Sequence, residues 1–249
     1  MNHAAEAAEL LSQLQALGTP GRAEGEKAYL KSELQFAGTG VPAMRATVRS
    51  WLGGHPGLAH DDLFAMADAL WAHPVHECRL AAIELLVARP SLVSLTDVPW
   101  IYGTLRDCHT WALVDPLAGW VTAGLALRDP DGLLPHLDRW VRDRDFWIRR
   151  SAVLALRSLL QVDRELDRFF AYAELLLDER EFFIRKVLGW VLREVAARHP
   201  ERVSAWLREH MAQMNLVTLR EPLCRLPDAV ELRRFYDASR PGSRRKSSG

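Results

Sequence analysis

The sequence predicts an all-α protein, built as a single-domain solenoid of stacked helix pairs. Apolar residues recur at intervals of three and four, as at Leu63, Met66, Ala67 and Leu70, which is the period of an amphipathic helix. Alternating strand-like runs are scarce. A segment of sequence also returns after 36 residues, and such a period is typical of a solenoid.

The predicted helices are separated by short stretches that contain Gly or Pro, whose backbone limits end helices. These stretches lie at residues 18–21, 38–42, 53–57, 73–74, 89–90, 129–132 and 199–200. They leave room for about a dozen helices of ordinary length joined by short turns. We expect the domain to span residues 1–238 and residues 239–249 to form a disordered basic tail.

The repeat is clearest between residues 148–157 and 184–193, which align with an offset of 36. The same frame reaches back along the chain and predicts a column of equivalent positions at 36-, 35- and 36-residue spacing, namely Arg79, Asp115, Arg150 and Lys186. Equivalent helices of a curved solenoid form a concave surface, where an extended partner is usually held. We therefore expect a concave groove lined by this column.

An aromatic row should run beside this column. The residues four positions before its members are Val75, Trp111, Phe146 and Phe182, one helical turn earlier on the same side. Aromatic planes beside basic side chains can hold a cationic group. For an isolated Trp, however, burial in the core is the commoner role.

The net charge does not indicate a protein that coats nucleic acid along its whole length, because 32 basic residues balance 32 acidic ones. Positive charge is concentrated locally instead. Residues 139–157 contain six Arg and two Asp, and residues 240–249 contain four basic residues and no acidic one. Any role in DNA binding must depend on this local distribution.

Several function classes are disfavoured. The first residues lack a secretory signal, and the uncharged stretch 116–127 is too short to span a bilayer. We expect a cytoplasmic monomer of bacterial type that reaches the nucleoid through DNA, with no membrane partner. The three cysteines, Cys78, Cys108 and Cys224, form no paired motif, and we expect reduced core thiols. No metal-ligand spacing or phosphate-binding loop indicates a metal or a cofactor.

Asp115 is the one acidic member of the column. It either pairs with a neighbouring Arg or stabilises positive charge that develops on a bound substrate, and spacing alone does not choose. Trp111 lies four residues earlier, so a helix places indole and carboxylate on one face. Trp190 follows Lys186 by four residues, and Arg193 comes one turn later.

Two predicted helices begin with an aromatic pair followed by a basic pair, at residues 146–150 and 182–186. Helix N-termini offer free backbone N–H groups, and nearby basic side chains make them suitable for phosphate. This pattern predicts a phosphate track that includes Arg149, Arg150, Phe182, Phe183 and Lys186. A solvated charged face with buried aromatic residues is the alternative.

In its order and spacing of motifs, the chain resembles the AlkD-like DNA glycosylases, the HEAT-like repeat enzymes of DNA alkylation repair. The resemblance runs from about residue 28 to 226. It rests on the opening segment with Tyr29, Lys31, Phe36, Gly38 and Arg45, on Trp111-x-x-x-Asp115, on residues 146–150, and on residues 181–194. The opening segment departs from the usual pattern at residues 34–40, and His109 and Thr110 precede Trp111 where other residue types are common.

The resemblance implies hydrolysis of the N-glycosidic bond of N3- and N7-alkylated purines in double-stranded DNA, without turning the damaged base into a pocket. Asp115 would stabilise the oxocarbenium-like sugar and orient water, and Trp111 and Trp190 would pack against the deoxyribose. Arg150 would hold the DNA backbone. The wider predicted DNA-binding set adds residues outside the catalytic group, namely Tyr29, Lys31, Arg45, Arg79, Arg149, Phe182, Phe183, Lys186 and Arg193.

Two other functions stay open. A non-catalytic relative would use the same groove to bind damaged or branched DNA, although such relatives are expected to lack part of the Trp and Asp set. A HEAT-like scaffold would bind protein partners instead, and the balanced net charge is compatible with that. Release of a base distinguishes the first alternative, and salt-sensitive binding of duplex DNA distinguishes the second.

Overall fold

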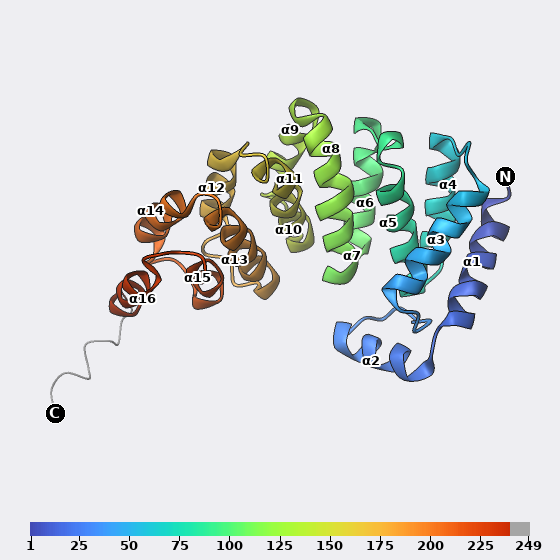
Figure 1. Cartoon of the computed structure of the whole chain (residues 1–249), viewed down its shortest axis with the longest axis horizontal. Helices are drawn as coiled ribbons and strands as arrows, with labels where there is room; N and C mark the ends of the chain where they lie inside the picture. Colours follow the sequence, from blue (N-terminus) through green and yellow to red (C-terminus); the bar gives the residue numbers. More distant parts are fainter. Residues whose placement is uncertain (240–249) are drawn as a thin grey trace. The chain divides into compact units, whose positions relative to one another are not determined.

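The computed structural model describes residues 1–239, and these residues are organised almost entirely as helices (Figure 1). Within the described part, the sole β-type pairing is one isolated bridge between Gln35 and Val75. The predicted all-α class is therefore confirmed. The predicted tail, residues 239–249, lies outside the described residues except for Ser239.

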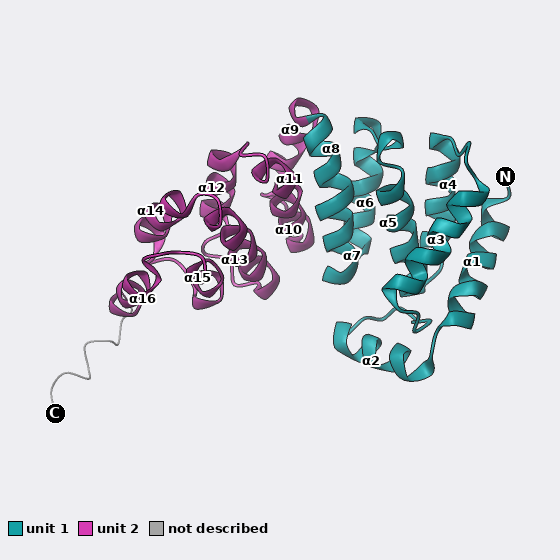
Figure 2. Ribbon diagram, in the orientation of Figure 1, with its two compact units in different colours: residues 1–129 teal, residues 130–249 magenta. Residues whose placement is uncertain are grey.

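The chain divides into two compact units, residues 1–129 and residues 130–249, coloured separately in Figure 2. Unit 1 contains the helices α1 (His3–Leu17), α2 (Pro20–Leu30), α3 (Val41–Gly54), α4 (His60–Trp71), α5 (His76–Ala88), α6 (Val98–Asp107), α7 (Trp111–Pro116) and α8 (Ala123–Arg128), with the 3-10 turns η1 (Pro90–Leu92) and η2 (Leu95–Asp97) and the π-helical segment η3 (Leu117–Thr122). Unit 2 contains α9 (Pro130–Trp140), α10 (Phe146–Ala155), α11 (Arg157–Leu160), α12 (Leu166–Leu175), α13 (Phe182–Ala196), α14 (Pro200–His210), α15 (Leu216–Leu223) and α16 (Ala229–Ala238).

The predicted repeat frame matches the helix starts. Trp111, Phe146 and Phe182 are each the first residue of a helix, and Val75 is the N-cap of α5. Column members therefore lie in the second turn of their helices, at equivalent positions. The repeat in the sequence therefore corresponds to helices that begin at equivalent positions.

Helix ends follow local chemistry. The side chains of Asn2, Thr110, Asp145 and Asn215 each accept a backbone N–H at the start of a helix. Proline occupies the first or second position of several other helices, including α2 and α14, where the missing N–H costs little. The stretches predicted as breaks accordingly fall at helix boundaries, and most of them include the first or last residues of a helix.

α5 is the central helix of unit 1. Almost every side chain along it is buried, and it packs against α1, α3, α4 and α7. In unit 2, α13 has the equivalent role and packs against α10, α14 and α15. Gly189 permits the close approach to α15, since a Cβ there would lie 2.9 Å from the carbonyl oxygen of Thr218.

The cysteine prediction is partly wrong. Cys78 and Cys108 are buried thiols, and burial raises the pKa of Cys78 to about 12, so it stays protonated. Cys224 is exposed instead, because it caps the end of α15, where its Sγ donates to the carbonyl oxygen of Glu221. None of the described helices has the length and apolar character needed to cross a membrane.

A buried carboxylate fixes the segment between α2 and α3. Glu77, at the start of α5, accepts the backbone N–H groups of Ala37, Gly38 and Thr39 at 2.9, 2.6 and 3.1 Å. Gly38 has φ 75°, a left-handed conformation that favours glycine. The side chain of Glu77 therefore ties this loop, and with it α2, to the core of unit 1.

We expect Glu77→Ala to lower the free energy of unfolding by about 3 kcal/mol, because three backbone donors lose a charged acceptor inside the protein. Urea denaturation followed by circular dichroism measures this change. Glu24→Ala, at an exposed position of α2, serves as the control and should change stability by less than about 0.5 kcal/mol. Equal effects of the two substitutions would contradict the role given to Glu77.

Candidate nucleic-acid interface

Trp111 and Asp115 lie on one side of α7, as predicted from their spacing. Thr110 caps this helix by accepting the N–H of Ala112 at 3.4 Å, and His109 before it has φ 50°. Both Trp111 and Asp115 are half-buried. A capped helix start thus holds an indole and a carboxylate one turn apart, with both partly accessible.

Tyr29 stands against Trp111. The two ring centroids are 6.2 Å apart and the rings are perpendicular, although Tyr29 comes from α2. Tyr29 is 74% exposed, and no residue of α2 is buried. The edge-to-face contact is therefore formed by a helix that packs lightly and presents its aromatic ring to solvent.

A cavity of about 310 Å³ opens beside these rings within unit 1. Its lining is mainly apolar and includes Trp111, Tyr29, Leu30, Val41, Met44, Leu80 and Pro116, with Glu26, Glu77 and Glu84 among its polar residues. His76 also lines it and stacks on Phe36 at 4.8 Å. Burial lowers the pKa of His76, so its imidazole is neutral at neutral pH, and its Nδ1 is a buried atom without a hydrogen-bond partner.

The basic residues predicted for phosphate in unit 1 differ in their surroundings. Arg45 donates from Nε and Nη2 to Glu84 at 2.8 and 2.7 Å, and the hydrogen bond to Glu84 raises the pKa of Arg45. Its side chain stays half-exposed. Arg79 is largely covered, because it lies 4.9 Å over the Trp71 ring and donates to the carbonyl oxygen of Asp107. Lys31 is exposed at the end of α2.

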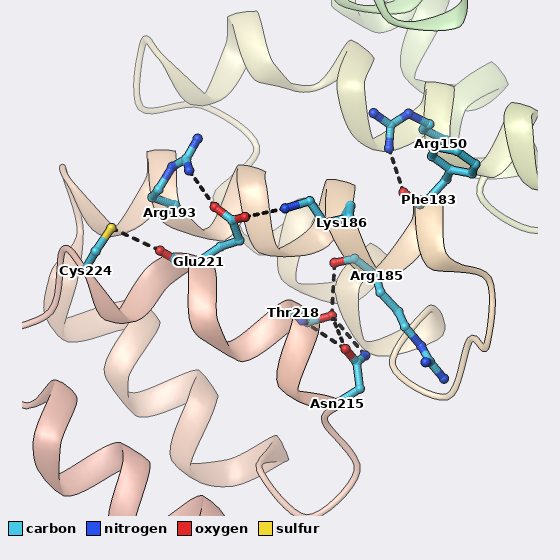
Figure 3. A network of polar contacts seen from close by, with 9 residues as sticks. All are labelled: Arg150, Phe183, Arg185, Lys186, Arg193, Asn215, Thr218, Glu221 and Cys224. Atoms are coloured by element: carbon cyan, nitrogen blue, oxygen red, sulfur yellow. Dashed lines mark hydrogen bonds and ion pairs between the residues drawn. The ribbon is translucent and has the colours of Figure 1, made fainter. Parts of the chain in front are cut away.

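In unit 2, the basic pair of α10 connects this helix to the first turn of α13 and to the segment before it. Arg150 is 5% exposed and donates to the carbonyl oxygen of Phe183 at 2.6 Å (Figure 3). Arg149 donates to the carbonyl oxygen of Asp143 and pairs with Glu179 at 2.8 Å. Both guanidinium groups therefore have structural contacts in addition to any contact with DNA.

The two helix starts predicted to bind phosphate are not equivalent. Asp145 caps α10 by accepting the N–H of Trp147 at 2.8 Å, which places a carboxylate at that N-terminus. Glu181 precedes α13 without a side-chain cap, so the first N–H groups of α13 are not satisfied in this way. A free N-terminus suits an anion better, so α13 is the stronger phosphate candidate.

The aromatic pairs form one cluster in unit 2. Phe183 stacks on Phe146 at 6.3 Å with an interplanar angle of 7°, and its centroid is 4.9 Å from that of Trp147. Trp147 is buried in this cluster, whereas Phe182 is 53% exposed. Phe182 is therefore the member of this cluster most open to a partner.

Lys186 and Arg193 share one acidic partner. Glu221 on α15 accepts Lys186 Nζ at 2.6 Å and Arg193 Nη1 at 2.5 Å (Figure 3). The hydrogen bond from Lys186 is the main cause that lowers the pKa of Glu221. Asn215 caps α15 and Thr218 donates to the carbonyl oxygen of Arg185, which fixes this helix against α13. The two predicted phosphate ligands thus share one carboxylate, and the three groups together keep a net positive charge.

Trp190 is half-buried on α13, one turn after Lys186. Its Nε1 donates to Glu194 at 2.7 Å, and the guanidinium of Arg157 lies 4.5 Å from its ring centroid. Trp190 thus has a polar contact at its edge and a cationic group over its face. Among the described residues, no three His, Cys, Asp or Glu side chains gather in a way that could hold a metal ion.

Comparison with known proteins decides the family. A family model described as "DNA alkylation repair enzyme" matches residues 10–226. The chain belongs to the DNA alkylation repair enzyme family. This agrees with the AlkD-like resemblance inferred from the motifs, and it makes repair of alkylated DNA the general role of the chain. A search of curated proteins found no match.

Three solved structures share the fold of this chain. A predicted DNA alkylation repair enzyme from Enterococcus faecalis aligns with a TM-score of 0.75 and 22% identity, covering 82% of this chain and 94% of that one. AlkD2 from Streptococcus mutans aligns with a TM-score of 0.54 and 16% identity, covering 86% and 97%. The protein smu.31 from Streptococcus mutans UA159 aligns with a TM-score of 0.52 and 16% identity, covering 78% and 97%.

The motifs of this DNA alkylation repair enzyme did not reveal the acidic partners of its basic residues. Glu84, Glu179, Glu194 and Glu221 each bind a cation that lies 28 to 39 residues earlier, about one repeat away. The spacing within these pairs varies, so no single period in the sequence indicates them. Each pair forms between side chains of successive repeats, which are distant along the chain.

Proposed function

We propose that this chain is a monofunctional DNA glycosylase that hydrolyses the N-glycosidic bond of N3- and N7-alkylated purines in double-stranded DNA, as a step of base excision repair. The observation that carries the proposal is Trp111 one turn before Asp115 on α7, with Tyr29 against the indole, in a chain of the DNA alkylation repair enzyme family. An aromatic and anionic site of this kind suits a cationic substrate.

Hydrolysis of this glycosidic bond depends more on an anion near the sugar than on a strong general base. Alkylation at N3 or N7 gives the purine a positive charge and makes it a good leaving group. As the glycosidic bond breaks, positive charge moves to the sugar, which becomes oxocarbenium-like. The carboxylate of Asp115 would stabilise that charge and orient the attacking water, and the products would be the free base and an abasic site.

The roles of the other proposed site residues are taken from the resemblance to the AlkD-like DNA glycosylases. Trp111 and Trp190 are proposed to pack against the deoxyribose of the lesion, so that the damaged base need not be extruded as it is in most glycosylases. We also propose that Arg150 contacts the DNA backbone. One of its guanidinium nitrogens, Nη1, already donates to the carbonyl oxygen of Phe183. We further propose that the protein acts as a monomer in a bacterial-type cytoplasm and reaches the nucleoid through DNA.

The DNA-binding set is proposed to combine exposed and ion-paired groups. Tyr29, Lys31 and Phe182 are exposed and available to a partner. Arg45, Lys186 and Arg193 each bind a carboxylate, so phosphate would have to compete with that carboxylate. We therefore expect binding that is modest in affinity and sensitive to salt.

Duplex DNA treated with a methylating agent tests the proposal. The protein should release 7-methylguanine and 3-methyladenine, which chromatography of the soluble fraction quantifies, and untreated DNA should release neither. Salt-sensitive binding without release of any alkylpurine would support the non-catalytic DNA-binding alternative instead. Absence of DNA binding at low salt would support the scaffold for protein partners.

A further inference from the structure

Trp190 is clamped at its edge and on its face. Its indole Nε1 donates to Glu194 Oε1 at 2.7 Å, and the Arg157 guanidinium lies 4.5 Å from the ring centroid. Glu194 also accepts Arg157 Nε and Nη2, both at 2.9 Å. One carboxylate and one guanidinium thus bind each other and the same ring.

The clamp is partly shielded from water. The side chain of Arg157 is 15% exposed and that of Glu194 is 32% exposed. Charge-assisted, two-pronged Arg–carboxylate contacts are stronger and more directional than neutral hydrogen bonds, and a partly desolvated guanidinium interacts better with an aromatic face. The edge contact and the face contact together restrict both the position and the tilt of the indole.

Trp206, another tryptophan in unit 2, is held differently from Trp190. Trp206 also donates to a carboxylate, Glu174, but at 3.2 Å, and its ring is buried between Phe170 and His210 at 5.6 and 4.6 Å. Packing alone can hold such a ring. Trp190 is only half-buried, so its orientation depends on Arg157 and Glu194 while part of the ring stays accessible.

We propose that Arg157 and Glu194 are positioning residues that fix the ring plane of Trp190 for contact with the deoxyribose of the lesion. This inference rests on the proposed glycosylase function. The pair itself does not touch the substrate. It acts through Trp190 by keeping the exposed part of the indole in one orientation before DNA arrives, which avoids ordering it during the reaction.

Single-turnover excision of 7-methylguanine from a defined duplex tests the proposal in a double-mutant cycle. Glu194→Gln should lower the rate roughly 10-fold while the Kd for DNA stays within about 2-fold, because misplacement of a positioned group mainly affects the rate. In a Trp190→Ala background, Glu194→Gln should have no further effect. Equal losses in both backgrounds would overturn the proposal.

Two matched variants complete the kinetic test. Arg157→Lys keeps the charge but not the planar two-pronged contact, so it should reproduce the effect of Glu194→Gln. Glu174→Gln removes the carboxylate partner of Trp206 and should leave the excision rate unchanged. A loss of rate with Glu174→Gln as large as that with Glu194→Gln would indicate a general structural effect and contradict positioning.

Nuclear magnetic resonance of the indole groups gives a readout that does not need activity. In protein labelled with ¹⁵N-tryptophan, Trp190→Phe assigns the Trp190 indole resonance. Glu194→Gln should shift this resonance and speed its hydrogen exchange with water, and an unchanged resonance would refute the clamp. If the wild-type protein releases no base, the proposed function fails, and this spectrum still reports whether the clamp exists.

Discussion

Replacing Asp115 by Asn is expected to lower the single-turnover rate of 7-methylguanine excision by roughly 100-fold or more, the scale of losing one preorganised electrostatic group at a reaction centre. The amide keeps the size of the side chain and removes its negative charge. In the proposed mechanism, the positive charge that develops on the sugar would then lose the carboxylate that stabilises it. Rates measured with enzyme in excess over a defined duplex give this effect directly.

Affinity for DNA should persist in the Asp115→Asn variant, because removing an acidic group does not weaken attraction to phosphate. Asp131→Asn, at an exposed position of α9, is the control and should excise at the wild-type rate. Circular dichroism and thermal melting exclude unfolding as the cause. An Asp115→Asn variant that excises as fast as wild type would remove Asp115 from the catalytic group.

Glu221→Gln should raise the affinity for undamaged duplex DNA roughly 10-fold in low salt, since its carboxylate pairs with two predicted phosphate ligands, Lys186 and Arg193, and competes with phosphate for both. The pKa of Glu221 is lowered, chiefly by the Lys186 hydrogen bond, so this carboxylate is ionised at neutral pH. Its contribution to stability is present above the usual carboxyl pKa and is lost as pH falls through the lowered value.

Fluorescence anisotropy with a labelled duplex at several salt concentrations measures the effect of Glu221→Gln. The plot of log affinity against log salt should become steeper by about 1 for each added phosphate contact. Glu231→Gln removes one of the two carboxylates that pair with Arg208, the other being Asp228. Arg208 is outside the predicted DNA-binding set, so this variant serves as the control. If Glu221→Gln leaves both affinity and slope unchanged, Lys186 and Arg193 are structural ion-pair residues and not phosphate ligands.

Periodicity predicted the helices and the repeat because both depend on short-range patterns. Gly and Pro marked the ends of helices, and the 36-residue frame placed Trp111, Phe146 and Phe182 at helix starts, as the structure confirms. The spacing of Trp111 and Asp115 was sufficient to place them on one side of a helix. Local sequence rules therefore account for most of the fold and for the nucleus of the candidate site.

Contacts between distant segments could not be predicted in this way. Tyr29 and Trp111 meet across 82 positions of sequence, through a helix that buries none of its own residues. The loop that follows α2 is held by Glu77, which belongs to none of the motifs found in the sequence. The partners of Arg157 and Lys186 depend on how side chains of successive repeats meet, and helical period alone does not specify this.

We propose that the chain breaks a glycosidic bond and does not merely bind DNA. A duplex oligonucleotide with a single 7-methylguanine, incubated with excess protein and then treated with alkali, tests it most directly. We expect strand cleavage at the lesion and release of free 7-methylguanine well above those of the same duplex incubated and alkali-treated without protein, and no cleavage of the undamaged duplex. Protein-bound but intact DNA, with no free base, would contradict it.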